Sequence, residues 1–167
     1  MAIEHDFFGL IESSPDGSIF WSEKVELGDQ SVTVDLTAPE QDDVSAQALD
    51  TAAGMISTVE AIDLRARNAM VNELSDRTSE VTEYILQQQE SLGEDLEEML
   101  VDHSGDVHID VIRSLILVSM TFLADAFEAA DKTFAVLEYG LDPDASEEML
   151  MVYLDTAGDI ISVTSTD

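Results

Sequence analysis

The stretch Thr133-FAVLEYGLDPDASEEMLMVYLDTAGDIISVT-Ser165 decides how this 167-residue chain folds. It contains three runs that are rich in β-branched and aromatic residues, as strands usually are. Asp142-Pro143-Asp144 ends the first run, because proline fixes φ and has no N–H to donate to a β-ladder. Ala157-Gly158-Asp159 predicts a tight hairpin turn, because glycine readily adopts the positive φ that such turns need. The stretch therefore predicts a three-stranded β-meander.

The beginning of the chain predicts a second meander. Phe7–Ile11 is a short apolar run and the expected first strand. Ser18–Leu27 follows it, and Gln30–Leu36 alternates apolar and polar residues, as a strand with one buried face does. Gly28-Asp29 is the expected hairpin turn between these two runs. We expect three antiparallel strands here.

The region between the meanders has helical periodicity. Apolar residues recur at spacings of three to five from Val44 onward. This predicts an amphipathic helix that begins near Pro39, reaches about Ile62 and continues over Leu64–Leu74. Ser75 is the expected N-cap of the next helix, because its hydroxyl accepts a hydrogen bond from a free backbone N–H.

Two more helices and one ambiguous run complete the central region. Gly93 is expected to break the helix before it, and a short acidic helix follows to about Val101. Val107–Val118 predicts a largely buried helix, whereas Val118–Ala124 fits both a helix and a strand. The order of elements predicts a single α+β domain over residues 1–167, with one antiparallel sheet packed against a central group of helices.

The charge of the chain is unusual. Six Lys and Arg face 37 Asp and Glu, for a net charge of −31. Nucleic acid and anionic membranes are unsuitable partners, because phosphate binding needs clustered Lys and Arg. Three interpretations stay open: halophilic adaptation, an acidic surface for a cationic protein, and binding of divalent cations.

The sequence predicts a cytoplasmic protein. It has no cysteine, which excludes disulfides, thiolate metal sites and thiol nucleophiles. The first residues lack the basic and apolar regions of a signal peptide, and the longest apolar run, near Leu115–Met120, is too short to span a bilayer.

One loop is a candidate metal site. His103, Asp106 and His108 lie within a short segment that also contains other carboxylates, and imidazole and carboxylate are common ligands of divalent transition metals. The alternative is a polar loop in which Asp106 caps the following helix. The acidic run Asp142–Glu148 is a weaker candidate for calcium, since it lacks the EF-hand pattern.

The chain contains no P-loop, no G-x-G-x-x-G and no G-x-S-x-G motif, so we expect no cofactor. The single tryptophan, Trp21, is read as a sheet anchor, with an exposed partner surface as the alternative. Tyr84, Tyr139 and Tyr153 are expected to pack against the fold with hydrated hydroxyl groups.

Several of these segments resemble a group of small bacterial proteins known only as a predicted cytosolic domain of unknown function. The resemblance rests on the Phe7-Phe8-Gly9 strand, the Gly28-Asp29 hairpin and the closing meander, and it covers nearly the whole chain. It implies an α+β cytosolic protein and a strand at Val118–Ala124. It brings no catalytic or binding residues. The chain departs from it at Phe127–Lys132, where a proline-containing turn would be expected.

The absence of chemical motifs predicts a non-enzymatic interaction or accessory protein whose acidic helices attract a cationic partner. The alternative is a small hydrolase-like enzyme that uses carboxylates and a histidine. The sequence leaves open a homodimer formed through a sheet edge or an apolar helix face.

Overall fold

The computed structural model describes residues 2–28, 30–40, 44–101, 103–124, 133–141 and 149–165. The predicted turn at Asp142-Pro143-Asp144, the acidic run to Glu148 and the connection Phe127–Lys132 lie outside these residues. The described strands are β1 (Ala2–His5), β2 (Gly9–Glu12), β3 (Ile19–Leu27), β4 (Gln30–Ala38), β5 (Ile116–Leu123), β6 (Ala135–Gly140), β7 (Leu150–Leu154) and β8 (Ile160–Ser165). The described helices are α1 (Ala46–Ser57), α2 (Val59–Glu73), α3 (Glu80–Leu92), α4 (Asp95–Met99) and α5 (Val107–Ser114).

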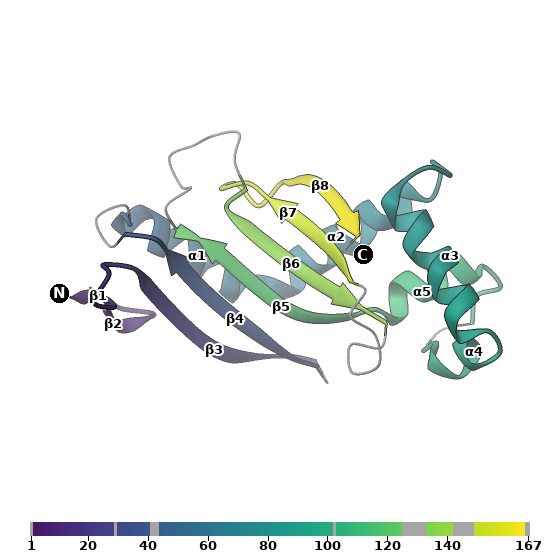
Figure 1. Ribbon diagram of the computed structural model, residues 1–167, viewed down its shortest axis with the longest axis horizontal. Coiled ribbons are helices and arrows are strands. Elements are labelled where there is room, and N and C mark those ends of the chain that lie inside the picture. The colour runs from purple at the N-terminus through teal and green to yellow at the C-terminus, as the bar shows by residue number, and fades with distance from the viewer. Residues whose placement is uncertain are drawn as a thin grey trace.

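The chain has an α+β fold, as predicted, built around a six-stranded sheet with the order β3-β4-β5-β6-β7-β8 (Figure 1). The expectation of a purely antiparallel sheet is wrong, because β4 and β5 pair in parallel while all other neighbours are antiparallel. All five helices lie between β4 and β5 in the chain, and such a long crossover lets the two strands run in the same direction.

The first predicted strand, Phe7–Ile11, is confirmed only from Gly9 onward, where β2 begins. Phe7 and Phe8 lie in a turn between β1 and β2, which form a separate two-stranded sheet. Gly9 has a φ of 70°, so the chain reverses at the point where the apolar run suggested a continuous strand. Phe8 is buried, and its ring meets that of Trp21 edge to face at 4.6 Å, which fixes the small hairpin against β3 and confirms Trp21 as an anchor of the sheet.

Helices α1 and α2 cover one face of the main sheet (Figure 1). The single long helix predicted here is interrupted at Thr58, where one helix ends and the next begins. The hydroxyl groups of Ser57 and Thr58 donate to the carbonyl oxygens of Ala53 and Gly54, at 2.9 Å each. Ser and Thr hydroxyl groups that bond to carbonyl oxygens of the preceding turn compete with the backbone hydrogen bonds of a helix. Two such residues follow one another here, at the point where the helix is interrupted.

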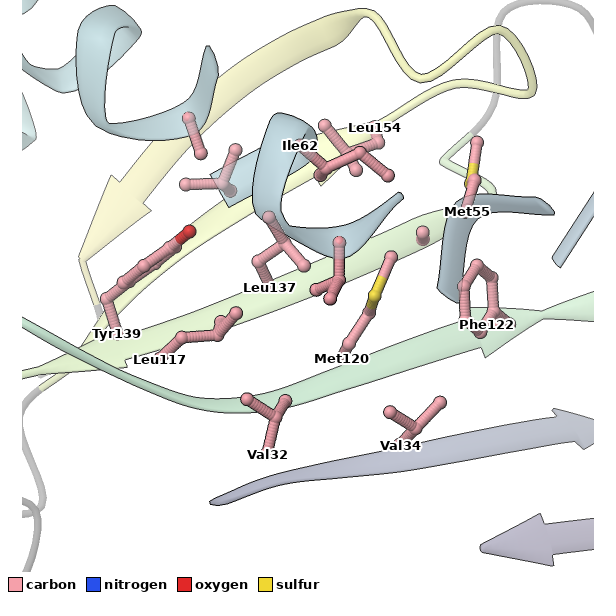
Figure 2. Close-up of a cluster of buried hydrophobic side chains, with 14 of the residues drawn as sticks. Val32, Val34, Met55, Ile62, Leu117, Met120, Phe122, Leu137, Tyr139 and Leu154 are labelled. Atoms are coloured by element: carbon pink, nitrogen blue, oxygen red, sulfur yellow. The ribbon is translucent and has the colours of Figure 1, made fainter. Parts of the chain in front are cut away.

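The hydrophobic core lies between these two helices and the sheet (Figure 2). Met55 and Ile62 point from the helices toward Met120, Leu137 and Leu154 on the central strands. Met120, Leu137 and Leu154 are fully buried, and complete burial of a side chain of this size stabilises the fold by about 1.5–3 kcal/mol.

The remaining helices, α3, α4 and α5, gather at one end of the sheet (Figure 1). Helix α3 is capped by Ser79, which accepts a hydrogen bond from the Thr82 N–H, rather than by Ser75 as predicted. Gly93 ends α3, as predicted, with a φ of 55°. Helix α5 stops at Ser114, so the ambiguous run Val118–Ala124 is mainly strand β5.

No helix among the described residues is both long and apolar enough to cross a membrane.

Candidate functional site

Residues 78–112 form an acidic end of the molecule. They contain ten Asp and Glu and no Lys or Arg. In the fold they comprise α3, α4, the loop that follows and most of α5, so sequence neighbours become one helical body beside the sheet (Figure 1). This segment, which we call the acidic end, concentrates negative charge in one place.

A hollow in the surface of the acidic end is lined by Gly93, Glu94, Glu97 and Glu98. The three glutamate side chains are exposed, and none of them takes part in an ion pair between described side chains. Three carboxylates without a bound counter-charge attract cations, above all Lys and Arg side chains, which bind carboxylates through charge-assisted hydrogen bonds.

The hollow rests on a well-anchored scaffold. Leu96 is 5% exposed and fixes the short helix α4 against the core. Its backbone N–H donates to the carbonyl oxygen of Gly93 at 3.3 Å, so α4 begins directly after the turn that ends α3. The three glutamates therefore project from a folded turn.

The three residues of the predicted metal site lie in and after the loop before α5. His103 is exposed, and His108 stands in the first turn of the helix. Asp106 is the N-cap: its Oδ1 accepts from the backbone N–H of His108 at 3.1 Å and of Ile109 at 3.4 Å, which confirms the capping alternative.

Within the described part of the chain no group of three or more potential metal-ligating side chains is found, and the neighbouring Asp102 lies outside that part. The metal site stays a prediction. Equilibrium dialysis against zinc tests it: binding that His103→Ala/His108→Ala abolishes would support it, and a lack of binding by the unmodified protein would remove it.

Asp110 is the structural centre of this loop, which the sequence did not indicate. It is only 2% exposed, and it accepts hydrogen bonds from the Ser104 hydroxyl at 2.7 Å and the Ser104 N–H at 3.0 Å. Burial by itself would raise the pKa of Asp110, but these hydrogen bonds, with the charges of His103 and Arg113, hold it below its ordinary value. Asp110 thus stays ionised and orders the loop.

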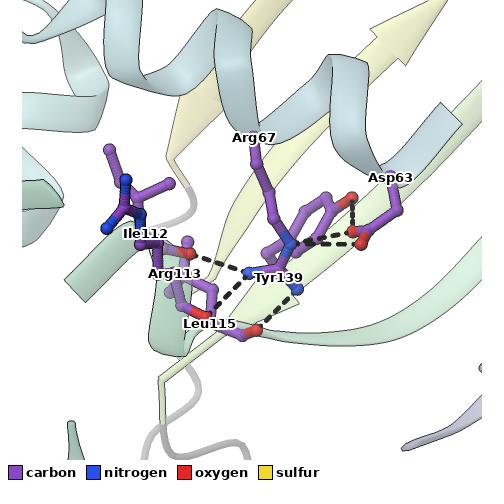
Figure 3. Close-up of polar contacts among 6 residues, drawn as sticks. All are labelled: Asp63, Arg67, Ile112, Arg113, Leu115 and Tyr139. Atoms are coloured by element: carbon purple, nitrogen blue, oxygen red, sulfur yellow. Dashed lines mark hydrogen bonds and ion pairs between the residues drawn. The ribbon is translucent and has the colours of Figure 1, made fainter. Parts of the chain in front are cut away.

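Arg67 ties the acidic end to the rest of the fold (Figure 3). Its Nη1 donates to the carbonyl oxygen of Ile112 at 2.8 Å, and its Nη2 to that of Leu115 at 2.7 Å. Its Nε donates to Asp63 Oδ1 at 3.0 Å, and the Tyr139 hydroxyl donates to the same oxygen at 2.7 Å. One guanidinium group therefore caps the end of α5 and joins it to α2 and β6.

The tyrosines correct one expectation. Tyr84 and Tyr139 are buried, so their hydroxyl groups are not hydrated as predicted. The Tyr84 hydroxyl accepts from the Leu141 N–H at 3.0 Å, and that of Tyr139 donates to Asp63. Burial, followed by the charge of Asp63, raises the pKa of Tyr139 well above its ordinary value.

The features that sequence reasoning missed join residues that are far apart in the chain. Arg67 and Leu115 are one example, and nothing in the local sequence around either residue indicates the pairing. By contrast, the lack of Lys and Arg over residues 78–112 is visible in the sequence and would have pointed to the acidic end. Comparisons with protein-family models, curated proteins and solved structures found no match for this chain.

Proposed function

We propose that this protein is a cytosolic, non-enzymatic interaction or accessory module that binds a cationic protein at its acidic end. The observation that supports this most directly is the hollow lined by Glu94, Glu97 and Glu98, whose exposed carboxylates stand in a 35-residue segment (78–112) without any Lys or Arg.

The physical basis is electrostatic. A concentrated negative potential attracts a positively charged partner from a distance and speeds their encounter, and this effect weakens as salt screens the charges. The exposed pairs formed on contact each contribute about 0.5 kcal/mol. Several such pairs are needed for useful affinity, and the three glutamates of the hollow supply them at one place.

The test is a fluorescence-anisotropy titration with a labelled lysine-rich peptide. Substitution of the hollow, Glu94→Gln/Glu97→Gln/Glu98→Gln, should weaken binding about tenfold, because three pairs of about 0.5 kcal/mol each are lost. A matched control, Glu12→Gln/Glu40→Gln/Glu60→Gln, removes the same charge from exposed positions elsewhere and should retain nearly full affinity.

Two outcomes would contradict the proposal. Equal weakening in both triple variants would mean that the peptide responds to net charge and not to the acidic end. Affinity that does not fall between about 0.05 and 0.3 M potassium chloride would exclude electrostatic recognition, since the Debye length shortens to roughly 40% of its initial value over this range.

A further inference from the structure

Strand β3 forms one edge of the main sheet (Figure 1). It pairs with β4 over nine residues without interruption, from Ile19 opposite Ala38 to Leu27 opposite Gln30. On its other side, only its first residue, Ile19, is bridged, by Ser13, the residue that directly follows β2. No other described strand pairs with it there. In an antiparallel ladder alternate residues direct their N–H and C=O groups away from the neighbouring strand, so β3 presents a row of such groups to a further strand.

The opposite edge of the sheet is protected. Strand β8 has six residues, and its register with β7 shifts near Leu154. Helix α3 packs beside it, and the Ser165 N–H donates to Glu80 Oε1 at 3.4 Å. Irregular registers and covering helices are common ways to block an edge strand. Strand β3 has neither a proline nor a bulge.

The charged side chains of β3 are complementary to those of β3 in a second copy of the chain. Lys24 and Glu26 are exposed on the face away from the helices, and neither takes part in an ion pair between described side chains. If a second β3 pairs antiparallel with Val25 on the two-fold axis, Lys24 of each copy stands opposite Glu26 of the other. The four charges then occupy a square in which every side joins unlike charges.

No other register of β3 with a residue on the axis sets unlike charges opposite one another. Moving the axis by one residue sets Lys24 or Glu26 opposite itself, and moving it by two toward the start of the strand sets Glu23 opposite itself. Like charges directly opposite one another destabilise a pair of strands, so the charge pattern favours the register centred on Val25. A lysine that stood alone would repel a second copy, whereas Lys24 has Glu26 two residues away on the same face.

We infer that two copies of this chain form a dimer by antiparallel pairing of their β3 strands, which joins the two sheets into one. This surface lies apart from the acidic end. The net charge of −31 on each copy opposes the association at low salt, so added salt strengthens the dimer. Binding of a cationic partner has the opposite salt dependence, which separates the two interactions in experiment.

The test is sedimentation velocity over a series of protein concentrations. As the protein concentration increases, the apparent mass should rise from the 18.2 kDa of a single chain toward twice that value. This rise should occur at a lower protein concentration in about 1 M than in about 0.1 M potassium chloride. At about 0.3 M salt, Lys24→Glu and Glu26→Lys should each weaken association about tenfold or more, because both oppose like charges. The double variant Lys24→Glu/Glu26→Lys restores the unlike pairs and should associate within about threefold of the unmodified protein.

The matched control is Glu98→Lys, which changes the net charge as much as Glu26→Lys but lies in the acidic end; it should leave the dimer intact and weaken binding of the lysine-rich peptide. Circular dichroism confirms that each variant is folded. A single-chain mass under all conditions would overturn the inference. So would a double variant that associates as weakly as the single ones.

Discussion

The hydroxyl group of Tyr139 and the Nε of Arg67 converge on the same oxygen of Asp63, at 2.7 and 3.0 Å. Tyr139 lies on β6 and the other two residues on α2, so a shared acceptor fixes the helix on the sheet. Because Arg67 also caps α5, the same side chain links this contact to the acidic end (Figure 3).

The Arg67→Ala variant should therefore lose about 2–4 kcal/mol of unfolding free energy, since it removes the charged partner of Asp63, which keeps only the Tyr139 hydroxyl, and leaves two carbonyl groups at the end of α5 without their donor. Urea unfolding measures this. Arg65→Ala is the control: Arg65 is exposed on the same helix, and its loss should change stability by no more than about 0.5 kcal/mol. Similar losses in both variants would mean that the network contributes little.

Alkaline pH should destabilise the protein through Tyr139. The folded state holds the phenol proton more tightly than the unfolded state, because the pKa of Tyr139 is raised. Above a pH of about 10 the unfolded chain releases this proton while the folded chain keeps it, so stability falls as pH rises. The Tyr139→Phe variant should show a shallower decline between about pH 10 and 11. An unchanged slope would assign the decline to other groups.

Acidic pH should destabilise the protein through Asp110. Its pKa is lowered in the folded state, so its contribution to stability is present above the ordinary aspartate pKa and is lost as pH falls through the folded value. Asp110→Asn should lower the melting temperature at pH 7, and the difference from the unmodified protein should shrink below about pH 4. If the difference stays constant across this range, the carboxylate charge has no part in ordering the loop.

Salt should stabilise the fold. With a net charge of −31, repulsion opposes compaction, and potassium chloride screens it. Thermal unfolding followed by circular dichroism should give a melting temperature that rises from low to molar salt. Dependence on molar salt for folding would favour halophilic adaptation as the origin of the acidity. A melting temperature independent of salt would show that the carboxylates are spaced widely enough to avoid repulsion.

At matched ionic strength, calcium and magnesium should raise the melting temperature no more than potassium chloride does if they act by screening alone. A rise in melting temperature with calcium alone would instead indicate a site that involves residues outside the described part, such as the acidic run that begins at Asp142, since a ligand of the folded state must stabilise it.

Local chemistry in the sequence predicted the turns and the strand faces. Gly158 has a φ of 80° in the β7–β8 turn, and Gly93 ends α3, both for the conformational reason expected. Val32, Val34 and Leu36 are buried on the helix side of β4, as their alternation predicted. These features depend on residues that are neighbours in the chain.

The errors have a common physical origin, because they concern features that depend on contacts between residues far apart in the chain. The helical connection between β4 and β5 decides whether the two strands pair in parallel. The sequence of neither strand indicates its direction in the sheet. The use of Arg67 as a helix cap needed the position of α5, which lies 45 residues further on. The metal site is not among these errors and stays a prediction, since the spacing of Asp106 and His108 also suits the helix cap that Asp106 forms with the His108 N–H.

The parallel pairing of β4 and β5 also has a consequence for how the chain reaches its native state. Thr33 and Ser119 stand side by side although 86 positions separate them. The strands within the β3–β4 pair and within β5–β8 are joined by short connections. Pairing of β4 with β5, by contrast, requires all five helices between them to be in place. Contacts between such distant positions slow folding. We expect the two ladders to form early and independently, and the central seam of the sheet to close last.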